Sequence, residues 1–268
     1  MDEDWFRKRV VYTVPGMDEV EVLREIVYRE VDGEGLPMDV YLPPRLRPDE
    51  RRAGVVLIHG GPVPRMPGRS IKNLGVFLSY GELLAASGLV AVMFDHRFHA
   101  FADLAGSAAN IAAAIAFAGQ QAERFHLDAD RLCLWAFSGG GSFLAPALRE
   151  RPEHVRCLVA FYAALDLRPL APRISDVPIE VLESYSPVAC FTAEPFAGPP
   201  LLVARAGQDQ PWLNATIDDF VRAALSANAP LDLLNHPSGR HGFDILDDHP
   251  RTHEILARTV EFVRTHTA

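Results

Sequence analysis

The sequence predicts a single α/β domain built on a mostly parallel, doubly wound sheet. Five short apolar runs lack the polar alternation of half-exposed strands, which is typical of strands buried on both faces: residues 55–58, 89–94, 132–135, 157–161 and 201–204. Helical segments lie between or after these runs, at 73–86, 101–124, 140–150, 212–227 and 250–266. The length of 268 residues fits one large domain of this class. Repetition of strand and helix therefore favours a parallel sheet with helices on both faces.

Upstream of these runs, the sequence indicates an antiparallel pair of strands. Residues 22–30 and 38–42 are strand-like, and the Asp-Gly-Glu-Gly turn at 32–35 separates them. We expect this hairpin at the edge of the sheet, which would make the sheet mixed.

The remaining irregular segments do not indicate a second domain. Residues 1–20 carry no clear pattern and are interpreted as an N-terminal arm, whereas 167–200 form a long proline-rich connection. That connection is too short for a large cap domain and is expected near the active site. The whole chain, 1–268, is therefore predicted to be one domain.

Composition and charge argue against several classes of partner. The chain is 49% hydrophobic and 23% charged, with a net charge of -9, and its only basic cluster is Arg7-Lys8-Arg9. Nucleic acid is not an expected partner, because a basic stripe to follow a phosphate backbone is missing. The N-terminus is acidic where a secretory signal would be basic, and we expect no apolar stretch to reach the ~20 residues of a membrane span. A cytoplasmic protein without a membrane partner is predicted.

The three cysteines, Cys133, Cys157 and Cys190, have neither metal-site nor redox spacing. An odd number also makes a disulfide framework a poor explanation. We expect free, buried thiols.

A serine at the end of a predicted strand is the candidate nucleophile. In residues 132–143, Ser138 lies between an apolar strand and a helix, with the small residues Ala136 and Gly140 two positions away on either side. This is the pattern of a nucleophile elbow, a turn so tight that bulky neighbours would collide. The alternative is a glycine-rich turn, 139–141, that binds phosphate or nothing. It lacks the lysine of a P-loop and the spacing of a dinucleotide fingerprint.

The elbow is one of four motifs that occur in a characteristic order. The others are His59-Gly60-Gly61-Pro62, Gly207-Gln208-Asp209 and the glycine-flanked histidine loop at 238–243. Together they resemble the α/β-hydrolase superfamily, particularly its compact esterases and dienelactone-hydrolase-like members. The resemblance covers the chain from about residue 37 to the C-terminus, and it implies a single-domain α/β-hydrolase fold.

The general base is predicted to be His241. Serine needs an adjacent base, which in this fold follows the nucleophile in the chain. His241 lies in a loop after the strand-like run 231–234 and before the last helix, where similar hydrolases carry their histidine. His236 is the competing candidate, but it directly follows the strand and lacks the glycine-flanked loop.

The acid that orients the histidine is predicted to be Asp209. It follows the apolar run 201–204 through a glycine turn and lies between Ser138 and His241 in the chain. A purely structural role for Asp209 would be as the N-cap of the next helix. Asp166 is the serious alternative, because some related hydrolases carry the acid after the preceding strand.

The loop at 59–62 corresponds to the oxyanion loop of the resembled family. Its glycines would let the backbone approach the substrate oxygen. Pro62 has no N–H to donate, so the hole is assigned to the amides of Gly61 and Gly139, with Gly60 as a further candidate. His59 is expected to brace the loop.

The resemblance implies hydrolysis of a carboxylic ester or lactone through a Ser-His-Asp triad and an acyl-enzyme, with a small-molecule acyl substrate. No metal or organic cofactor is expected. One alternative is a prolyl-type or other small peptidase or amidase, since the loop at 59–62 also looks like that of prolyl-type peptidases. Another is a non-catalytic ligand receptor on a hydrolase fold. The sequence leaves the natural substrate open. It also leaves the oligomeric state open, and a homo-oligomer is one possibility.

Overall fold

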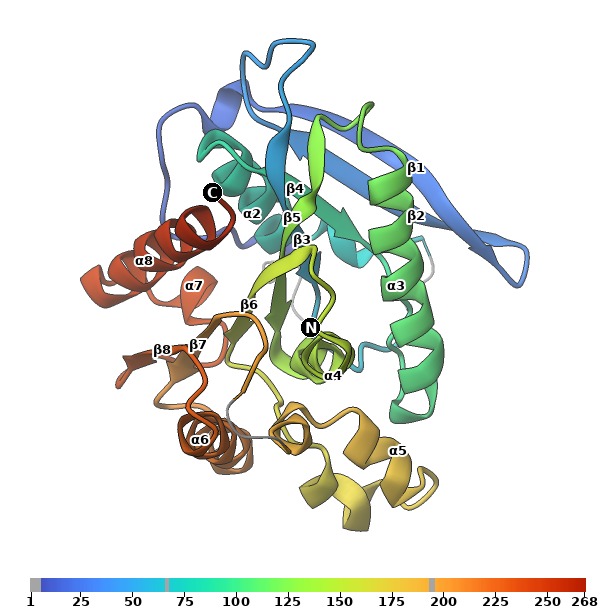
Figure 1. Cartoon of the computed structure of the whole chain (residues 1–268), viewed down its shortest axis with the longest axis vertical. Helices are drawn as coiled ribbons and strands as arrows, with labels where there is room; N and C mark the ends of the chain where they lie inside the picture. Colours follow the sequence, from blue (N-terminus) through green and yellow to red (C-terminus); the bar gives the residue numbers. More distant parts are fainter. Residues whose placement is uncertain (1–5, 66–67, 193–195) are drawn as a thin grey trace.

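One mixed sheet of eight strands organises the chain, in the order β1-β2-β4-β3-β5-β6-β7-β8 (Figure 1). The computed structural model describes residues 6–65, 68–192 and 196–268. The strands are β1 (Glu21–Val31), β2 (Glu34–Leu42), β3 (Arg52–Ile58), β4 (Val90–Phe94), β5 (Leu127–Phe137), β6 (Val155–Phe161), β7 (Leu201–Ala206) and β8 (Leu231–His236). β1 pairs antiparallel with β2 and β2 with β4, while every pairing from β4 to β8 is parallel. The predicted fold class is confirmed.

Helices cover both faces of this sheet (Figure 1). They are α2 (Gly75–Ala86), α3 (Leu104–Gln120), α4 (Ala145–Glu150), α5 (Ile179–Ser184), α6 (Pro211–Ser226), α7 (Phe243–Leu246) and α8 (Pro250–His266). Short 3-10 helices are η1 (Met17–Glu19), η2 (Ile71–Asn73), η3 (Phe101–Asp103), η4 (Ser138–Leu144), η5 (Arg168–Arg173) and η6 (Pro187–Cys190). α2 and α8 pack on one face, and α3, α4 and α6 pack on the other.

Alternation along the strands divides the interior into two cores. Val55 and Leu57 of β3 belong to the core under α2 and α8, whereas Val56 and Ile58 belong to the core under α3, α4 and α6. All four side chains are essentially inaccessible to solvent. A strand with helices on both faces must be apolar at every position, which explains the unbroken apolar runs in the sequence.

The direction of winding reverses between β3 and β5. The chain runs from β3 outward to β4 on one side, then crosses over to β5 on the other side of β3. Open α/β sheets bind ligands outside the carboxyl ends of the strands at such a switch point. A ligand site is therefore expected at the loops after Ile58 and Phe137.

Two helices differ from their predicted bounds. The segment predicted at 101–124 begins as η3, and α3 ends at Gln120. The segment predicted at 140–150 is a 3-10 helix over Ser138–Leu144 and becomes α-helical only at Ala145–Glu150. Consecutive glycines have low helix propensity, and those after Ser138 pack closely against neighbouring loops, which favours the tighter 3-10 geometry there.

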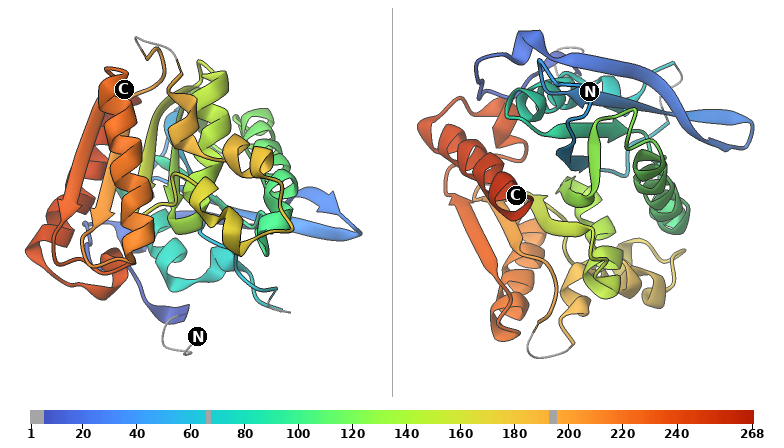
Figure 2. Two further views of the ribbon diagram at one scale, coloured as in Figure 1. Left: turned by 90° about the horizontal axis from the view of Figure 1, so that it is seen from below. Right: turned by 45° about the horizontal axis from the view of Figure 1, so that its top comes forward.

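The β1–β2 hairpin forms one edge of the sheet and extends beyond its neighbours (Figure 2). Ahead of it, the predicted N-terminal arm crosses α2 and α7. The Val10 N–H donates to Ser79 Oγ at 2.9 Å, and the Val11 N–H donates to the Asp244 carbonyl at 2.8 Å. Residues 1–5 of this arm, and 193–195 of the 167–200 connection, lie outside the described residues.

All three cysteines are free and buried, as predicted. Cys133 of β5 and Cys157 of β6 are register neighbours inside the sheet. Cys190 lies in η6, where its thiol approaches the Ala145 carbonyl at 3.5 Å.

The expectation that no apolar stretch reaches the length of a membrane span needs correction. The helical segment Phe101–Gln120 has 20 residues and a mean hydropathy of 1.5. Length and composition alone do not separate such a segment from the core helix of a soluble protein. Its α3 part packs against β1 and β5, with Leu104, Ile111 and Ala114 buried.

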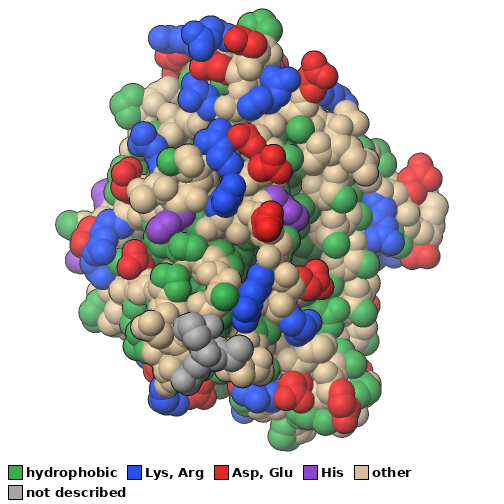
Figure 3. Space-filling model, viewed as in Figure 1, with side chains coloured by type: hydrophobic (Ala, Val, Ile, Leu, Met, Phe, Trp, Pro, Cys, Tyr) green, Lys and Arg blue, Asp and Glu red, His purple; other side chains and the backbone are tan. Residues whose placement is uncertain are grey.

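Charges of both signs share the face of the molecule drawn in Figure 3. Lys and Arg side chains lie among Asp and Glu side chains there. Ion pairs between described residues include Arg45 with Glu19 and Arg97 with Glu34. This face carries no continuous basic stripe. The absence of a nucleic-acid partner stays a prediction.

Candidate active site

Ser138 stands on a strained turn between β5 and η4. Its φ is +51°, in the left-handed region that L-residues other than glycine rarely adopt. The Ala164 N–H, from the end of β6, donates to the Ser138 carbonyl at 2.9 Å and holds the turn in place. This is the geometry that lifts a serine hydroxyl above the sheet.

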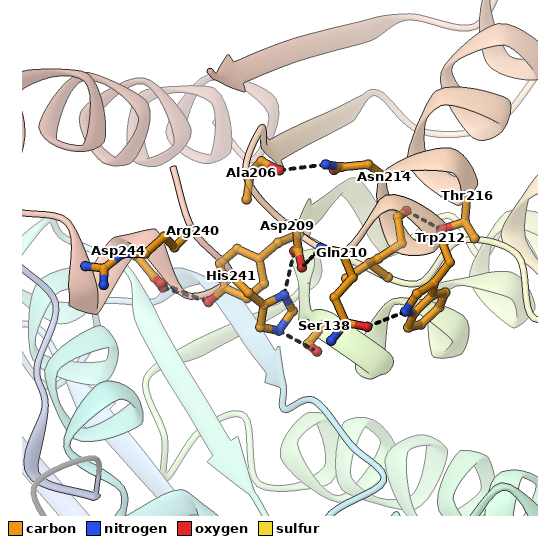
Figure 4. Close-up of polar contacts among 12 residues, drawn as sticks. Ser138, Ala206, Asp209, Gln210, Trp212, Asn214, Thr216, Arg240, His241 and Asp244 are labelled. Atoms are coloured by element: carbon orange, nitrogen blue, oxygen red, sulfur yellow. Dashed lines mark hydrogen bonds and ion pairs between the residues drawn. The ribbon is translucent and has the colours of Figure 1, made fainter. Parts of the chain in front are cut away.

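The structure brings Ser138, His241 and Asp209 together, although they lie far apart in the chain (Figure 4). His241 Nε2 is 3.0 Å from Ser138 Oγ, and His241 Nδ1 is 2.6 Å from Asp209 Oδ2. The arrangement requires Nδ1–H to donate to the carboxylate, which leaves Nε2 to accept the serine O–H. The Asp209 side chain is 2% exposed and that of His241 is 40% exposed, so the acid is enclosed while the base remains reachable.

The loops that carry the acid and the base are tied to each other by their backbones. The Gly207 N–H donates to the His236 carbonyl at 2.8 Å, and the Gln208 N–H donates to the Gly239 carbonyl at 2.9 Å. Asp209 Oδ1 accepts a hydrogen bond from the Gln210 N–H at 2.7 Å, which fixes the second carboxylate oxygen. These bonds set the separation of Asp209 and His241 before any substrate arrives.

The two competing residues from the sequence are engaged elsewhere. Asp166 accepts hydrogen bonds from Arg168 Nε and NH2 at 2.9 and 2.8 Å. Burial alone would raise the pKa of Asp166, but these hydrogen bonds outweigh it and lower the pKa below its usual value. His236 is buried beside Thr252 of α8, with Nε2 at 3.1 Å from Thr252 Oγ1. Neither side chain forms a hydrogen bond or an ion pair with Ser138 or His241.

The loops after β3 and β5 approach each other without room for side chains. A Cβ on Gly139 would lie 1.8 Å from the Gly61 carbonyl oxygen, and one on Gly60 would lie 2.8 Å from Ser138 Cβ. Within the described residues, the N–H groups of Gly61 and Gly139 donate no hydrogen bond. They are therefore available to an oxygen placed next to Ser138.

His59 supports this loop from below as a neutral ring. Its Nδ1 is 2.7 Å from the Gly60 carbonyl, and its ring stacks on that of His96 with centroids 3.6 Å apart. Burial lowers the pKa of both rings, and the neighbouring His59 lowers the pKa of His96 further. A neutral His59 can donate from Nδ1 and so fix the Gly60 peptide.

Replacing Gly139 with alanine should lower kcat/KM by about 100-fold or more. The new Cβ must displace the Gly61 backbone and with it the N–H donors of the oxyanion hole. Loss of one such donor lowers activity on this scale. Gly106→Ala is the matched control. Gly106 lies in α3 with nothing within 4 Å of its added Cβ, so it should keep full activity and gain about 0.5–1 kcal/mol of stability. Ester kinetics and urea unfolding measure both effects. A folded Gly139→Ala enzyme with full activity would contradict the expected crowding.

Behind His241 lies a buried group of hydrogen-bonded side chains, Asp244 with Tyr80 and Tyr162, that was not predicted from the sequence. The Tyr162 ring packs edge-on against the His241 ring, with centroids 4.8 Å apart. Asp244 accepts hydrogen bonds from Tyr80 Oη at 2.6 Å and from Tyr162 Oη at 3.0 Å, and burial raises the pKa of its carboxyl group. The sequence could have indicated that Tyr162 lies at the site. It directly follows β6, and side chains that follow parallel strands gather at the edge of the sheet where ligands bind.

Two cavities meet at Ser138. The apolar cavity, of about 270 Å³, is lined by Phe6, His59, Gly60, Gly61, Pro62, Val63, Ile71, Leu74, Val76, Phe77, Phe137, Ser138, Tyr162, His241, Gly242 and Ile245. The Arg173 cavity, of about 290 Å³, is lined by Gly61, Pro62, Phe101, Ser138, Gly139, Ala164, Leu167, Leu170, Arg173, Asp209, Gln210, Trp212, Leu213 and His241. A substrate whose reacting carbon contacts Ser138 thus has space for one group on each side. Within residues 6–65, 68–192 and 196–268, no cluster of His, Cys, Asp and Glu has a metal-binding arrangement.

Comparison with known proteins finds one similar family and a set of similar folds. The BD-FAE family model matches residues 38–167, a segment that contains the loop at 59–62 and Ser138. No curated protein matches the sequence.

Solved structures of an esterase from the Planctomycetes species Thermogutta terrifontis, Est2, are similar over nearly the whole chain. The native enzyme has a TM-score of 0.74 at 22% identity, covering 94% of this chain and 94% of that one. The butyrate-bound form has a TM-score of 0.73 at 22% identity, covering 94% and 95%, and the form phosphoramylated by tabun has 0.72 at 23%, covering 94% and 96%. The chain is thus similar in sequence to the BD-FAE family over residues 38–167, and it shares the fold of this esterase over nearly its whole length.

Proposed function

We propose that this chain is a serine hydrolase that cleaves carboxylic esters, lactones included, through an acyl-enzyme on Ser138. The observation that carries the proposal is the hydrogen-bonded series Ser138, His241 and Asp209 beside the unoccupied N–H groups of Gly61 and Gly139. Nucleophile, base, orienting acid and oxyanion donors are the four parts that acyl transfer requires.

In the first half-reaction, His241 Nε2 removes the Ser138 proton as Oγ attacks the ester carbonyl carbon. The carbonyl oxygen gains negative charge and accepts hydrogen bonds from the Gly61 and Gly139 amides, while Asp209 stabilises the imidazolium without taking its proton. The alcohol then leaves as the C–O bond breaks, and it takes the proton from Nε2. Ser138 remains bonded to the acyl group.

In the second half-reaction, water takes the place of the alcohol. His241 removes a proton from the water, whose oxygen attacks the acyl carbon, and the bond to Ser138 Oγ breaks as Oγ recovers a proton from Nε2. The products are a carboxylic acid, an alcohol and the free enzyme. The butyrate-bound and propionate-bound structures of the Thermogutta terrifontis esterase support short acyl groups as the first substrates to try.

Short p-nitrophenyl esters and aminoacyl p-nitroanilides, offered to the same purified protein, test this proposal. We expect turnover of the esters and labelling of Ser138 by a fluorophosphonate probe, because an accessible, activated serine reacts with both. Faster hydrolysis of the anilides would favour a peptidase or amidase. Failure to hydrolyse any substrate, together with failure to label, would favour a non-catalytic ligand receptor.

A further inference from the structure

The two cavities at Ser138 differ in charge. No Asp, Glu, Lys or Arg is among the residues that line the apolar cavity. The Arg173 cavity has two charged lining residues, Asp209 and Arg173. A substrate that fills both cavities therefore meets a neutral wall on one side and ionic groups on the other.

Only one of those two charges is available to a ligand. Both oxygens of Asp209 already accept hydrogen bonds, one from His241 and one from the Gln210 N–H. The guanidinium of Arg173 is exposed at the end of η5 and forms no ion pair or hydrogen bond with another described residue. Arg168, at the start of η5, is by contrast held by Asp166. Among the described lining residues, Arg173 is therefore the one cation without a carboxylate partner, while the oxygens of Asp209 are turned to His241 and the Gln210 N–H.

The uncharged polar side chains of this cavity offer a donor as well. Gln210 Oε1 accepts a hydrogen bond from Trp212 Nε1 at 2.6 Å, which turns the Gln210 amide so that its NH2 group is the free end. Figure 4 shows the Gln210 side chain between Ser138 and Trp212. Apart from Ser138 and His241, the free side-chain hydrogen-bonding groups of the described lining residues are the Arg173 guanidinium and the Gln210 NH2, and both are donors. A ligand that matches them must supply acceptors.

The rest of the wall is hydrocarbon. Buried Ala164, Leu167, Leu170 and Leu213 line the cavity together with Ser138 and the polar groups. The volume of about 290 Å³ lies at the lower end of small-molecule sites. A matching ligand therefore has a short apolar spacer between its reacting carbon and its acceptor group.

We propose that the substrate carries a carboxylate on the side of the scissile ester that enters the Arg173 cavity, separated from the ester group by a short hydrocarbon spacer. This inference rests on the proposed ester hydrolysis and names its substrate class. A guanidinium presents paired N–H donors that match a carboxylate, and the Gln210 NH2 group is a further donor on the wall of the same cavity. With a net charge of -9 the protein as a whole repels anions, so a local cation gives selectivity that the overall field does not.

Two pairs of esters test the proposal, since either the acyl group or the alcohol group could occupy this cavity. The first pair is the monoethyl ester of glutaric acid and its neutral isostere, in which a carboxamide replaces the free carboxylate. The second is the acetyl ester of 3-hydroxypropanoate and the corresponding carboxamide. In at least one pair, wild-type kcat/KM should favour the carboxylate by about two- to fivefold, the scale of an exposed ion pair. The preference should fall as salt is added.

Substitutions at Arg173 then locate the source of the preference. Arg173→Gln should bring the ratio of the two kcat/KM values close to one, Arg173→Lys should retain part of it, and Arg173→Glu should reverse it. Arg222→Gln is the matched control, because Arg222 is an exposed arginine of α6 paired with Asp219, away from both cavities. It removes the same unit of charge and should leave the ratio at its wild-type value.

The outcomes separate this inference from the proposed function. Hydrolysis of all four esters with a ratio of one or less in both pairs would overturn the carboxylate assignment and leave the esterase standing. The same holds if Arg173→Gln keeps the wild-type ratio. Lack of hydrolysis of all four esters and of p-nitrophenyl acetate would instead reject the proposed function itself.

Discussion

Ser138→Ala should lower kcat for ester hydrolysis by about 10⁶-fold, the scale of loss when a serine nucleophile of this kind is removed. The reason is that no other described side chain at the meeting point of the two cavities has a hydroxyl within reach of His241 Nε2. The residual rate should come from the oxyanion donors and from substrate binding. Active-site titration with a fluorophosphonate, alongside steady-state kinetics, measures the loss.

Alanine at this position should not unfold the protein. Circular dichroism and the urea midpoint should match the wild type to within about 1 kcal/mol, since the Ser138 hydroxyl bonds only His241 within the described residues. The positive φ of +51° costs alanine about as much as serine. A folded Ser138→Ala enzyme that keeps most of its ester turnover would end the nucleophile assignment.

Asp209→Asn should lower kcat by about 10⁴-fold while the fold is retained. An asparagine amide can donate to His241 Nδ1, which stabilises the tautomer that carries its proton on Nε2 and can no longer accept from serine. The amide also lacks the charge that balances the imidazolium. Since the Asp209 side chain is only 2% exposed, water cannot reach this position to stabilise the imidazolium in place of the carboxylate.

Asp166→Asn is the control for this experiment, and it should cost less than about tenfold in kcat. Its main effect should be on stability, a loss of about 1 kcal/mol near neutral pH from the weakened bonds to Arg168. Because the folded state lowers the pKa of Asp166, this stabilisation is present above the unfolded-state pKa and is lost as the pH falls through the folded value. Urea unfolding near pH 7 and near pH 3 measures the difference. If the two activity losses come out reversed in folded proteins, the acid is Asp166.

The order of elements could be predicted from sequence because each signal is local. Strands such as β5 and β6 are apolar at successive positions since helices cover both faces, and the Asp32-Gly33 turn predicts the β1–β2 hairpin directly. The serine elbow is equally local, because the positive φ of Ser138 requires small neighbours within two residues. Asp209 and His241 needed the resemblance as well, since their approach depends on how β7 and β8 pair.

The parts that could not be predicted depend on long-range packing. The 167–200 connection was expected near the active site, but it is proline-rich and has no periodic pattern, so the sequence does not single out Arg173 within it as the residue beside Ser138. Asp244 and Tyr80 are 164 positions apart, and their hydrogen bond forms only because α2 and α7 pack on the same side of the sheet. Phe6 reaches the apolar cavity through backbone bonds of the arm to Ser79 and Asp244, which a sequence pattern does not encode.

The burial of all three native cysteines makes the protein a convenient scaffold for site-selective labelling. The thiols of Cys133 and Cys157 are buried between the sheet and its helices, and the Cys190 thiol is buried against α4. An Arg173→Cys variant would therefore carry one sulfhydryl open to a maleimide dye, without removal of any native residue that the cores require. Fluorescence of that dye would report directly, in real time, on what enters and leaves the cavity beside Ser138.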